Sequence, residues 1–216
     1  DDKPIVLLDL GEMNQIVPVD KELGLISVQP GVTQQQLFEY LEVNGWEHMT
    51  PVTGAGPSCS LLSNLLERGY GITPNTDHFQ ATNKINAIFP NPKLWQQSEN
   101  REESLSQFVY ESAVASMDKS EEKFIDHTFK WGVGAYVDGL LTQSSMGVVT
   151  EATIRLAKKP EGFASFYIKI NGADKLKQTI NFIRDTLRNF EGIVGSINLM
   201  DKRRVLSMVT KNPNGK

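Results

Sequence analysis

A segment rich in glycine and hydroxyl side chains is the strongest chemical feature of this sequence. Residues 53–60 read Thr-Gly-Ala-Gly-Pro-Ser-Cys-Ser, and a short helical pattern follows them. Glycines allow a backbone to approach a ligand closely, and the first amides of a helix attract a phosphate group. The segment has no lysine after its glycines, as a Walker A loop would, and it is not a GxGxxG fingerprint. Composition alone therefore favours a structural loop, with a phosphate site as the alternative.

A second dense cluster covers residues 69–79, which contain two glycines, Pro74 and the neighbouring pair Asp77 and His78. An acid next to a histidine suggests acid–base chemistry. Neighbours on an extended segment, however, point to opposite faces and need not share a proton. We therefore expect Asp77 to cap a turn and His78 to be a buried residue with a hydrogen-bond partner.

Other side chains with catalytic or metal-binding chemistry are few. The chain has one cysteine, Cys59, and three histidines without close spacing. This pattern excludes an internal disulfide and gives no zinc or iron motif. Nothing in the sequence identifies a base that would activate Cys59 as a nucleophile. The sequence therefore assigns no catalytic residue and no metal site.

The composition is that of an ordinary globular chain. Of 216 residues, 39% are hydrophobic and 22% charged, and the formal net charge is -4. No global positive field exists to attract nucleic acid or an anionic membrane. No apolar run approaches the roughly 18 residues that span a bilayer. We expect a cytoplasmic protein that binds neither nucleic acid nor a membrane.

The apolar patterns that must position these residues indicate an α+β fold. Short apolar runs predict strands at residues 5–10, 16–19, 23–28, 84–89, 94–97 and 148–157. Thr33 followed by Gln36 is a capping-box pattern, and helical spacing continues from there to Asn44–Gly45. The first three strands should form an antiparallel meander before this helix.

A shorter helix is expected over residues 60–69, directly after the glycine-rich segment. Ser58 or Ser60 would cap its start, and Gly69 would adopt a left-handed conformation at its end. The start of this helix would then emerge from the glycine-rich loop, which is where a phosphate would bind in the alternative interpretation of that loop.

The second half of the chain is less regular. Residues 84–89 and 94–97 would form a hairpin, residues 101–117 a weak helix, and residues 158–162 a linker. Beyond the linker the pattern predicts a strand, a helix and a strand at residues 166–170, 176–187 and 193–199. A second unit should therefore start after the linker.

Three segments together resemble the flavoprotein family of vanillyl-alcohol oxidase and p-cresol methylhydroxylase. In that family a glycine-rich loop leads into a Ser-x-x-Gly-Asn helix and then an acidic-Arg-Gly-x-Gly-x-Thr-Pro run ending in Asp-His. This chain matches that pattern at Ser60, Asn64, Glu67, Arg68, Gly69, Gly71, Thr73, Pro74, Asp77 and His78. A second family signature resembles residues 136–150, Tyr-Val-Asp-Gly-Leu-Leu-Thr-Gln-Ser-Ser-Met-Gly-Val-Val-Thr. Pro30-Gly31-Val32-Thr33 before a helix also fits the family.

The resemblance implies an FAD cofactor and a set of residues that would contact it. Those expected to face the FAD pyrophosphate are Gly54, Gly56, Ser58, Ser60 and Asn64. Those expected along the flavin are Gly71, Ile72 and Thr73. Those expected to present backbone to the adenine half are Gly147, Val148 and Val149.

The resemblance also implies a domain organisation and an activity. Residues 1–160 would be the later part of a two-subdomain PCMH-type FAD-binding domain, and residues 161–216 the beginning of an α+β substrate (cap) domain. The implied reaction transfers a hydride from an alcohol, a phenolic side chain or a 2-hydroxy acid to flavin N5. The alternative is a truncated or degenerate homologue without catalysis that acts as a binding or interaction module.

By the same resemblance, this chain is expected to be the middle of a longer flavoenzyme. The family's first pyrophosphate loop would precede residues 5–10, so we expect the chain by itself to bind FAD weakly or not at all. Besides a small-molecule substrate, its expected partner is a second copy of the chain or a complementing chain that supplies the missing piece.

Overall fold

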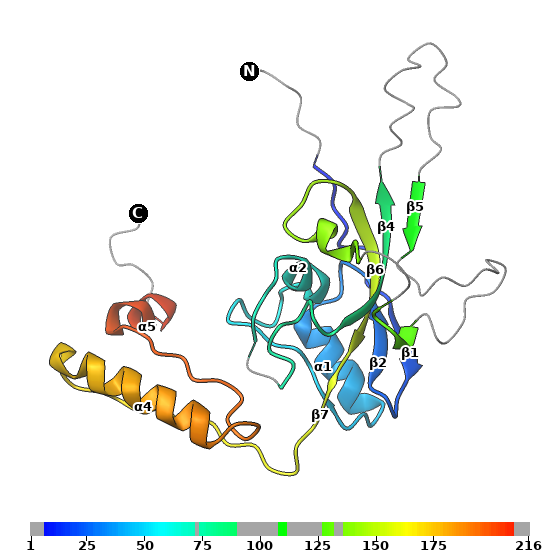
Figure 1. Cartoon of the computed structure of the whole chain (residues 1–216). Helices are drawn as coiled ribbons and strands as arrows, with labels where there is room; N and C mark the ends of the chain where they lie inside the picture. The colour runs from blue at the N-terminus through cyan, green and yellow to red at the C-terminus, as the bar shows by residue number, and fades with distance from the viewer. Residues whose placement is uncertain (1–6, 72–73, 90–107, 112–126, 132–135, 210–216) are drawn as a thin grey trace, which may run out of the picture. The chain divides into compact units, whose positions relative to one another are not determined.

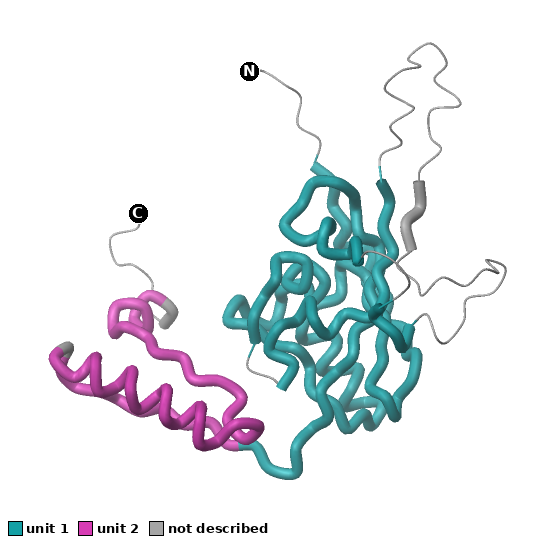
Figure 2. Tube along the Cα trace, viewed as in Figure 1, with its two compact units in different colours: residues 1–163 teal, residues 164–216 magenta. Residues whose placement is uncertain are grey.

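The computed structural model describes residues 7–71, 74–89, 108–111, 127–131 and 136–209 (Figure 1). It is α+β, as the sequence predicts. The chain divides into two compact units, residues 1–163 and residues 164–216 (Figure 2). Each unit is described by itself.

The first unit is built on a five-stranded sheet in which all neighbouring strands are antiparallel. The strand order is β1-β2-β6-β4-β5. The strands are β1 (Ile16–Asp20), β2 (Leu25–Val28), β4 (Thr82–Phe89), β5 (Phe108–Glu111) and β6 (Val148–Arg155). A separate two-stranded sheet pairs β3 (His48–Met49) with β7 (Ala157–Lys158). Strands far apart in sequence, β2 and β6, are therefore neighbours at the centre.

A polar turn forms the hairpin between β1 and β2. The side chain of Asp20 accepts a hydrogen bond from the amide of Leu23 at 2.8 Å, and Gly24 has a φ of 69° that favours glycine. Both strands were predicted from their apolar runs, and both are confirmed.

Helix α1 (Gln34–Val43) has the capping box that its sequence predicts. The hydroxyl of Thr33 accepts from the amide of Gln36 at 3.2 Å, and the amide of Thr33 donates to the Gln36 side chain at 2.8 Å. The helix ends at Asn44, and Gly45 follows with a φ of 62°. Local chemistry alone therefore sets both ends of α1.

Replacing Thr33 with alanine should lower the free energy of unfolding by about 1 kcal/mol, because the amide of Gln36 loses its acceptor. Urea unfolding measures the change. Gln35→Ala on the same turn is the matched control, since it removes only an exposed side-chain bond to Glu39 and should cost a few tenths of a kcal/mol. Equal losses in the two variants would contradict the assignment of Thr33 as the cap.

The core lies between one face of the sheet and helices α1 and α2 (Leu61–Leu66), as Figure 1 shows. Alternate residues of the central strands point toward the helices. The buried residues of this core include Ile26, Val28, Leu37, Leu41, Leu62, Leu65, Ile85, Ala87, Ala152 and Ile154. This packing fixes α2 against the sheet.

The opposite face of the sheet carries buried polar residues. Ser27 and Thr153 share a 2.7 Å hydrogen bond between hydroxyls, and His127 bonds Thr153 through Nδ1 at 2.8 Å. The amide group of Asn83 donates to the carbonyl of His127 at 2.9 Å. His127 therefore attaches to the sheet through polar contacts.

The C-terminal end of α2 differs from the sequence prediction. Glu67 is the C-cap, and Arg68, with a φ of 56°, takes the left-handed conformation that was expected of Gly69. A methyl group at Gly69 would overlap the side-chain amide of Asn64. Gly69 is therefore required for close packing rather than for a left-handed turn.

Two further predictions in the first unit are wrong. Residues 7–10 form no strand, and Leu7 and Leu8 are 91% and 61% exposed, because no neighbouring strand pairs with them. Residues 108–111, predicted within a weak helix, form β5, which pairs with β4. The expected hairpin partner at residues 94–97 lies outside the described residues. Cross-strand pairing with β4 overrode the weak local preference at 108–111.

The second unit contains η3 (Ala173–Lys175), α4 (Leu176–Asn189) and α5 (Lys202–Val209). The predicted helix at 176–187 is confirmed. The strands predicted at 166–170 and 193–199 do not form. An alternating pattern becomes a strand only beside another strand, and the described residues of this unit contain none.

No helix in the described part of the chain is both long enough and apolar enough to cross a membrane.

Candidate functional site

The glycine-rich segment is a loop with an exposed backbone, as predicted. Gly54 and Ser58 are exposed, and a methyl group at Gly54 or Gly56 would meet no atom within 4 Å. Gly56 has a φ of 105°, which favours glycine. Within the described chain, the amides of Gly54, Gly56 and Ser58 donate to no protein acceptor. The loop thus presents three backbone donors, which is the chemistry of an anion site.

Helix α1 holds this loop in place. The side chain of Gln34 donates to the hydroxyl of Thr53 at 3.0 Å and accepts from the Thr53 amide at 3.1 Å. The amide of Gln34 donates to the Cys59 carbonyl at 3.0 Å, and the amide of Gln35 donates to the Pro57 carbonyl at 3.0 Å. Both arms of the loop are therefore fixed by the first turn of α1.

Ser60 is the N-cap of α2, one of the two alternatives that the sequence left open. Its hydroxyl accepts from the amide of Ser63 at 3.1 Å and donates to the carbonyl of Pro30. The amide of Leu61 donates to the Val32 carbonyl at 3.0 Å. Two of the first three amides of α2 are thus engaged within the protein. The loop before the helix, rather than the helix end, carries the available donors.

Asp77 and His78 have the structural roles that the sequence favoured. A carboxylate oxygen of Asp77 accepts from the amide of Gln80 at 3.1 Å, and the other accepts from Arg68 at 3.1 Å. His78 is 5% exposed and bonds Asn64 instead, with 2.6 Å between Nδ1 of His78 and Oδ1 of Asn64. No proton relay joins Asp77 to His78.

The residues expected along the flavin and the adenine lie in different places. Ile72 and Thr73 are outside the described residues, whereas Gly71 is buried against the imidazole of His78. Gly147 precedes β6, and a methyl group there would lie 2.9 Å from the carbonyl oxygen of Ile88. Val148 and Val149 are the first residues of β6, and Val149 belongs to the core.

The 53–60 loop and the segment that precedes Gly147 meet opposite ends of α2. The amide of Gln143, four residues before Gly147, donates to the Leu66 carbonyl at 3.0 Å, at the end of the helix. The 53–60 loop joins the start of α2. A helix of six residues is about 9 Å long.

A cation among aromatic rings is a feature that the sequence analysis missed. Nζ of Lys130 donates to the carbonyls of Phe79 and Gln80 at 3.1 and 2.9 Å. It lies 5.2, 5.8 and 5.6 Å from the ring centres of Phe79, Trp131 and Tyr136. Burial lowers the pKa of Lys130 below its ordinary value. No spacing pattern relates position 130 to position 79, so only the folded chain reveals this contact.

Burial also lowers the pKa of His78 below its ordinary value of 6.5, and the charge of Asp77 opposes this shift. The folded chain therefore binds the proton less readily than the unfolded chain. His78 contributes stability that is fully present above pH 6.5 and is lost as the pH falls below 6.5 toward the folded-state pKa.

We expect urea unfolding to show a loss of stability on acidification below this pH, and a smaller loss in His78→Asn, which does not titrate in this range. Some loss should persist in that variant, because burial and Lys158 also lower the pKa of His48. An identical pH dependence of the variant and the parent chain would contradict the role assigned to His78.

Among the described residues, no three His, Cys, Asp or Glu side chains gather as a metal site requires.

Comparison with known proteins decides the family. A model described as an FAD binding domain matches residues 2–85. The chain is 30% identical over 209 residues to 1'-carboxy-chondrochloren decarboxylase from Chondromyces crocatus, covering 96% of this chain and 35% of that protein. It is 27% identical over 179 residues to the flavoprotein subunit of 4-cresol dehydrogenase [hydroxylating] from Pseudomonas putida, covering 83% of this chain and 31% of that subunit.

These matches support the PCMH-type FAD-binding flavoprotein family for this chain. The family and its cofactor, FAD, are those that the sequence motifs predicted, so both predictions are confirmed. The chain spans about a third of the length of the curated relatives it matches.

Solved structures agree with this family. The crystal structure of p-cresol methylhydroxylase with substrate bound matches with a TM-score of 0.68 and 25% identity, over 83% of this chain and 31% of that one. The isoeugenol complex of 4-ethylphenol oxidase from Gulosibacter chungangensis matches with the same TM-score and 23% identity, over 85% of this chain and 31% of that one, and supports the fold.

Proposed function

We propose that this chain forms part of the FAD site of an oxidoreductase and holds the FAD pyrophosphate on the loop at residues 53–60. The observation that carries the proposal is the set of three unengaged backbone amides, those of Gly54, Gly56 and Ser58, on a loop fixed at both arms by α1. Oriented amides of this kind bind phosphate oxygens without a positive side chain. The open space at both glycines leaves room for the ligand to approach the backbone.

The other predicted contacts extend this site. We infer that Gly147, Val148 and Val149 present backbone to the adenine half, and that Gly71, Ile72 and Thr73 lie along the flavin. Asn64 and Ser60 would support the site through α2, since their side chains already bond His78 and Pro30.

When bound, the flavin would supply the redox chemistry by accepting a hydride at N5 from an alcohol, a phenolic side chain or a 2-hydroxy acid. The residues of this chain would bind and orient the cofactor. Residues 161–216 would begin the substrate domain. A complementing chain is also part of the proposal, because the Pseudomonas putida relative is named as one subunit of its enzyme.

A flavin titration tests the proposal. Purified chain is titrated with FAD while flavin fluorescence and absorption are followed. Of the two outcomes that the sequence leaves open, weak binding or none, the proposal requires weak binding, so we expect saturable binding at one site. Absence of saturable binding up to about millimolar FAD, which corresponds to about -4 kcal/mol, would overturn the proposal. The measured affinity also tests the expectation that the chain alone binds FAD weakly, since submicromolar binding would contradict it.

Reduction of the bound flavin by candidate substrates separates an oxidoreductase from the second candidate function, a flavin-binding module without catalysis. Bleaching of the flavin absorption by an alcohol, an alkylphenol or a 2-hydroxy acid would support the oxidoreductase. Bound flavin that no substrate of the three classes reduces would support the binding module.

A further inference from the structure

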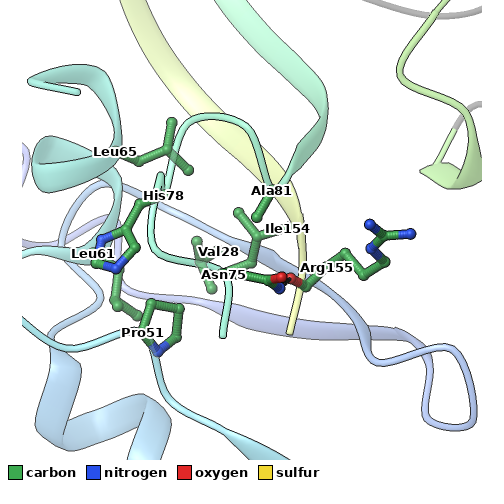
Figure 3. Close-up of a pocket in the computed structure, with 9 residues that line it drawn as sticks. All are labelled: Val28, Pro51, Leu61, Leu65, Asn75, His78, Ala81, Ile154 and Arg155. Atoms are coloured by element: carbon green, nitrogen blue, oxygen red, sulfur yellow. Dashed lines mark hydrogen bonds between the residues drawn. The ribbon is translucent and has the colours of Figure 1, made fainter. Parts of the chain in front are cut away.

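A buried histidine lines the same small cavity as residues on both sides of the candidate phosphate loop. His78 lines a small internal cavity together with Pro51 and Leu61 (Figure 3). Pro51 precedes the 53–60 loop, and Leu61 follows it as the first residue of α2. The imidazole is therefore positioned to influence the spacing between the two ends of the loop.

The orientation of this imidazole is fixed on one side by a hydrogen bond. Its Nδ1 is 2.6 Å from Oδ1 of Asn64, and an amide oxygen can only accept, so Nδ1 carries the proton in this bond. The other nitrogen, Nε2, is buried and has no hydrogen-bond partner in the described part of the chain. It is then the unprotonated nitrogen of a neutral ring.

Gly71 connects this nitrogen to the loop. A methyl group at Gly71 would overlap both Nε2 of His78 and the carbonyl oxygen of Val52, which directly precedes Thr53. The methylene of Gly71 thus packs between the imidazole and the first arm of the loop. Gly71 is itself held by its amide, which donates to the Thr76 carbonyl at 2.9 Å. A change in the imidazole would therefore be passed to Val52 by direct packing.

We propose that His78, oriented by Asn64, is a positioning residue for the loop at residues 53–60, and that it sets the directions of the Gly54 and Gly56 amides without contacting the cofactor. The expected effect of His78 on FAD binding rests on the proposed function. The expected effect of His78 on the loop does not depend on FAD, so the positioning role and the proposed function can be tested separately.

The test compares His78→Phe, which keeps a ring but no donor, with His78→Asn, whose side-chain amide keeps a donor at the position of Nδ1. Nitrogen-15 NMR of the glycine amides is recorded without FAD, and FAD affinity is measured by the titration above. We expect the resonances of Gly54 and Gly56 to shift in His78→Phe and to move less in His78→Asn. FAD affinity should fall about tenfold in the first variant, or about 1.4 kcal/mol.

Ile85→Ala, in the core on β4, controls for a general loss of stability, and its Gly54 and Gly56 resonances should stay unchanged. If His78→Phe does not fold, Asn64→Leu replaces it, because it keeps the imidazole and removes the acceptor. Unshifted glycine resonances in the folded variant would overturn the positioning role, whether or not FAD binds. Shifted resonances in the variant, together with a parent chain that binds no FAD, would uphold the positioning role and overturn the proposed function.

Discussion

Replacing Ser58 with aspartate should weaken FAD binding by about a hundredfold. Ser58 is exposed at the end of the loop that presents the Gly54, Gly56 and Ser58 amides. A carboxylate there would repel the pyrophosphate and compete for the same amides. Each charge-assisted hydrogen bond is worth about 1.5–3 kcal/mol, and 1.4 kcal/mol is a factor of ten. Loss of one or two such bonds therefore gives the expected factor.

Ser58→Asn is the matched control, because it has the same shape as aspartate and no charge. It should bind FAD within about threefold of the parent chain, which corresponds to under 1 kcal/mol. Neither variant should change the free energy of unfolding by more than about 0.5 kcal/mol, since the side chain is exposed. The deficit of Ser58→Asp should also shrink as salt is added, because exposed charges are screened. Equal FAD affinity for the two variants would contradict the assignment of the pyrophosphate to this loop.

Replacing Gly71 with alanine should destabilise the first unit by about 1–3 kcal/mol or more, the usual cost of inserting a methyl group into a packed interior. The new methyl group would overlap the His78 imidazole on one side and the Val52 carbonyl on the other. A side chain can rotate away, but the carbonyl belongs to the backbone. Relief therefore requires the backbone before the loop to move. Urea unfolding, followed by tryptophan fluorescence, measures the loss.

Gly162→Ala is the matched control for this substitution. A methyl group at Gly162 would meet no atom within 4 Å, and this glycine has no positive φ. Its stability should stay within about 0.5 kcal/mol of the parent chain. If Gly71→Ala were as stable as Gly162→Ala, the close packing of Gly71 against His78 would be wrong.

The parts of the fold that sequence predicted best depend on short-range chemistry. The capping-box hydrogen bonds join Thr33 and Gln36, which lie within one helical turn. The carboxylate of Asp77 accepts a hydrogen bond from the amide of Gln80, three residues later. Residue type and spacing carry all the information that such contacts need. The same holds for the glycine-rich loop, because its glycines, proline and small polar residues disfavour a regular helix or strand.

The predictions that failed required information about distant neighbours. Residues 108–111 form a strand because they pair with β4. Residues 166–170 form no strand, because no partner strand is described in their unit. A strand gains its hydrogen bonds from another segment, and the sequence of one segment cannot show whether that segment exists.

By itself, the sequence determined the family, the cofactor and the loop that we propose to hold it. Only the tertiary structure decided which groups of that loop are available. The hydroxyl of Ser60 is engaged by Pro30, thirty positions earlier, and the side chain of Asn64 by His78, fourteen positions later. A donor or acceptor can bind a ligand only when the fold has not already given it a partner. Those partners are set by packing between segments, so the free amides of the 53–60 loop appear only once the chain is folded.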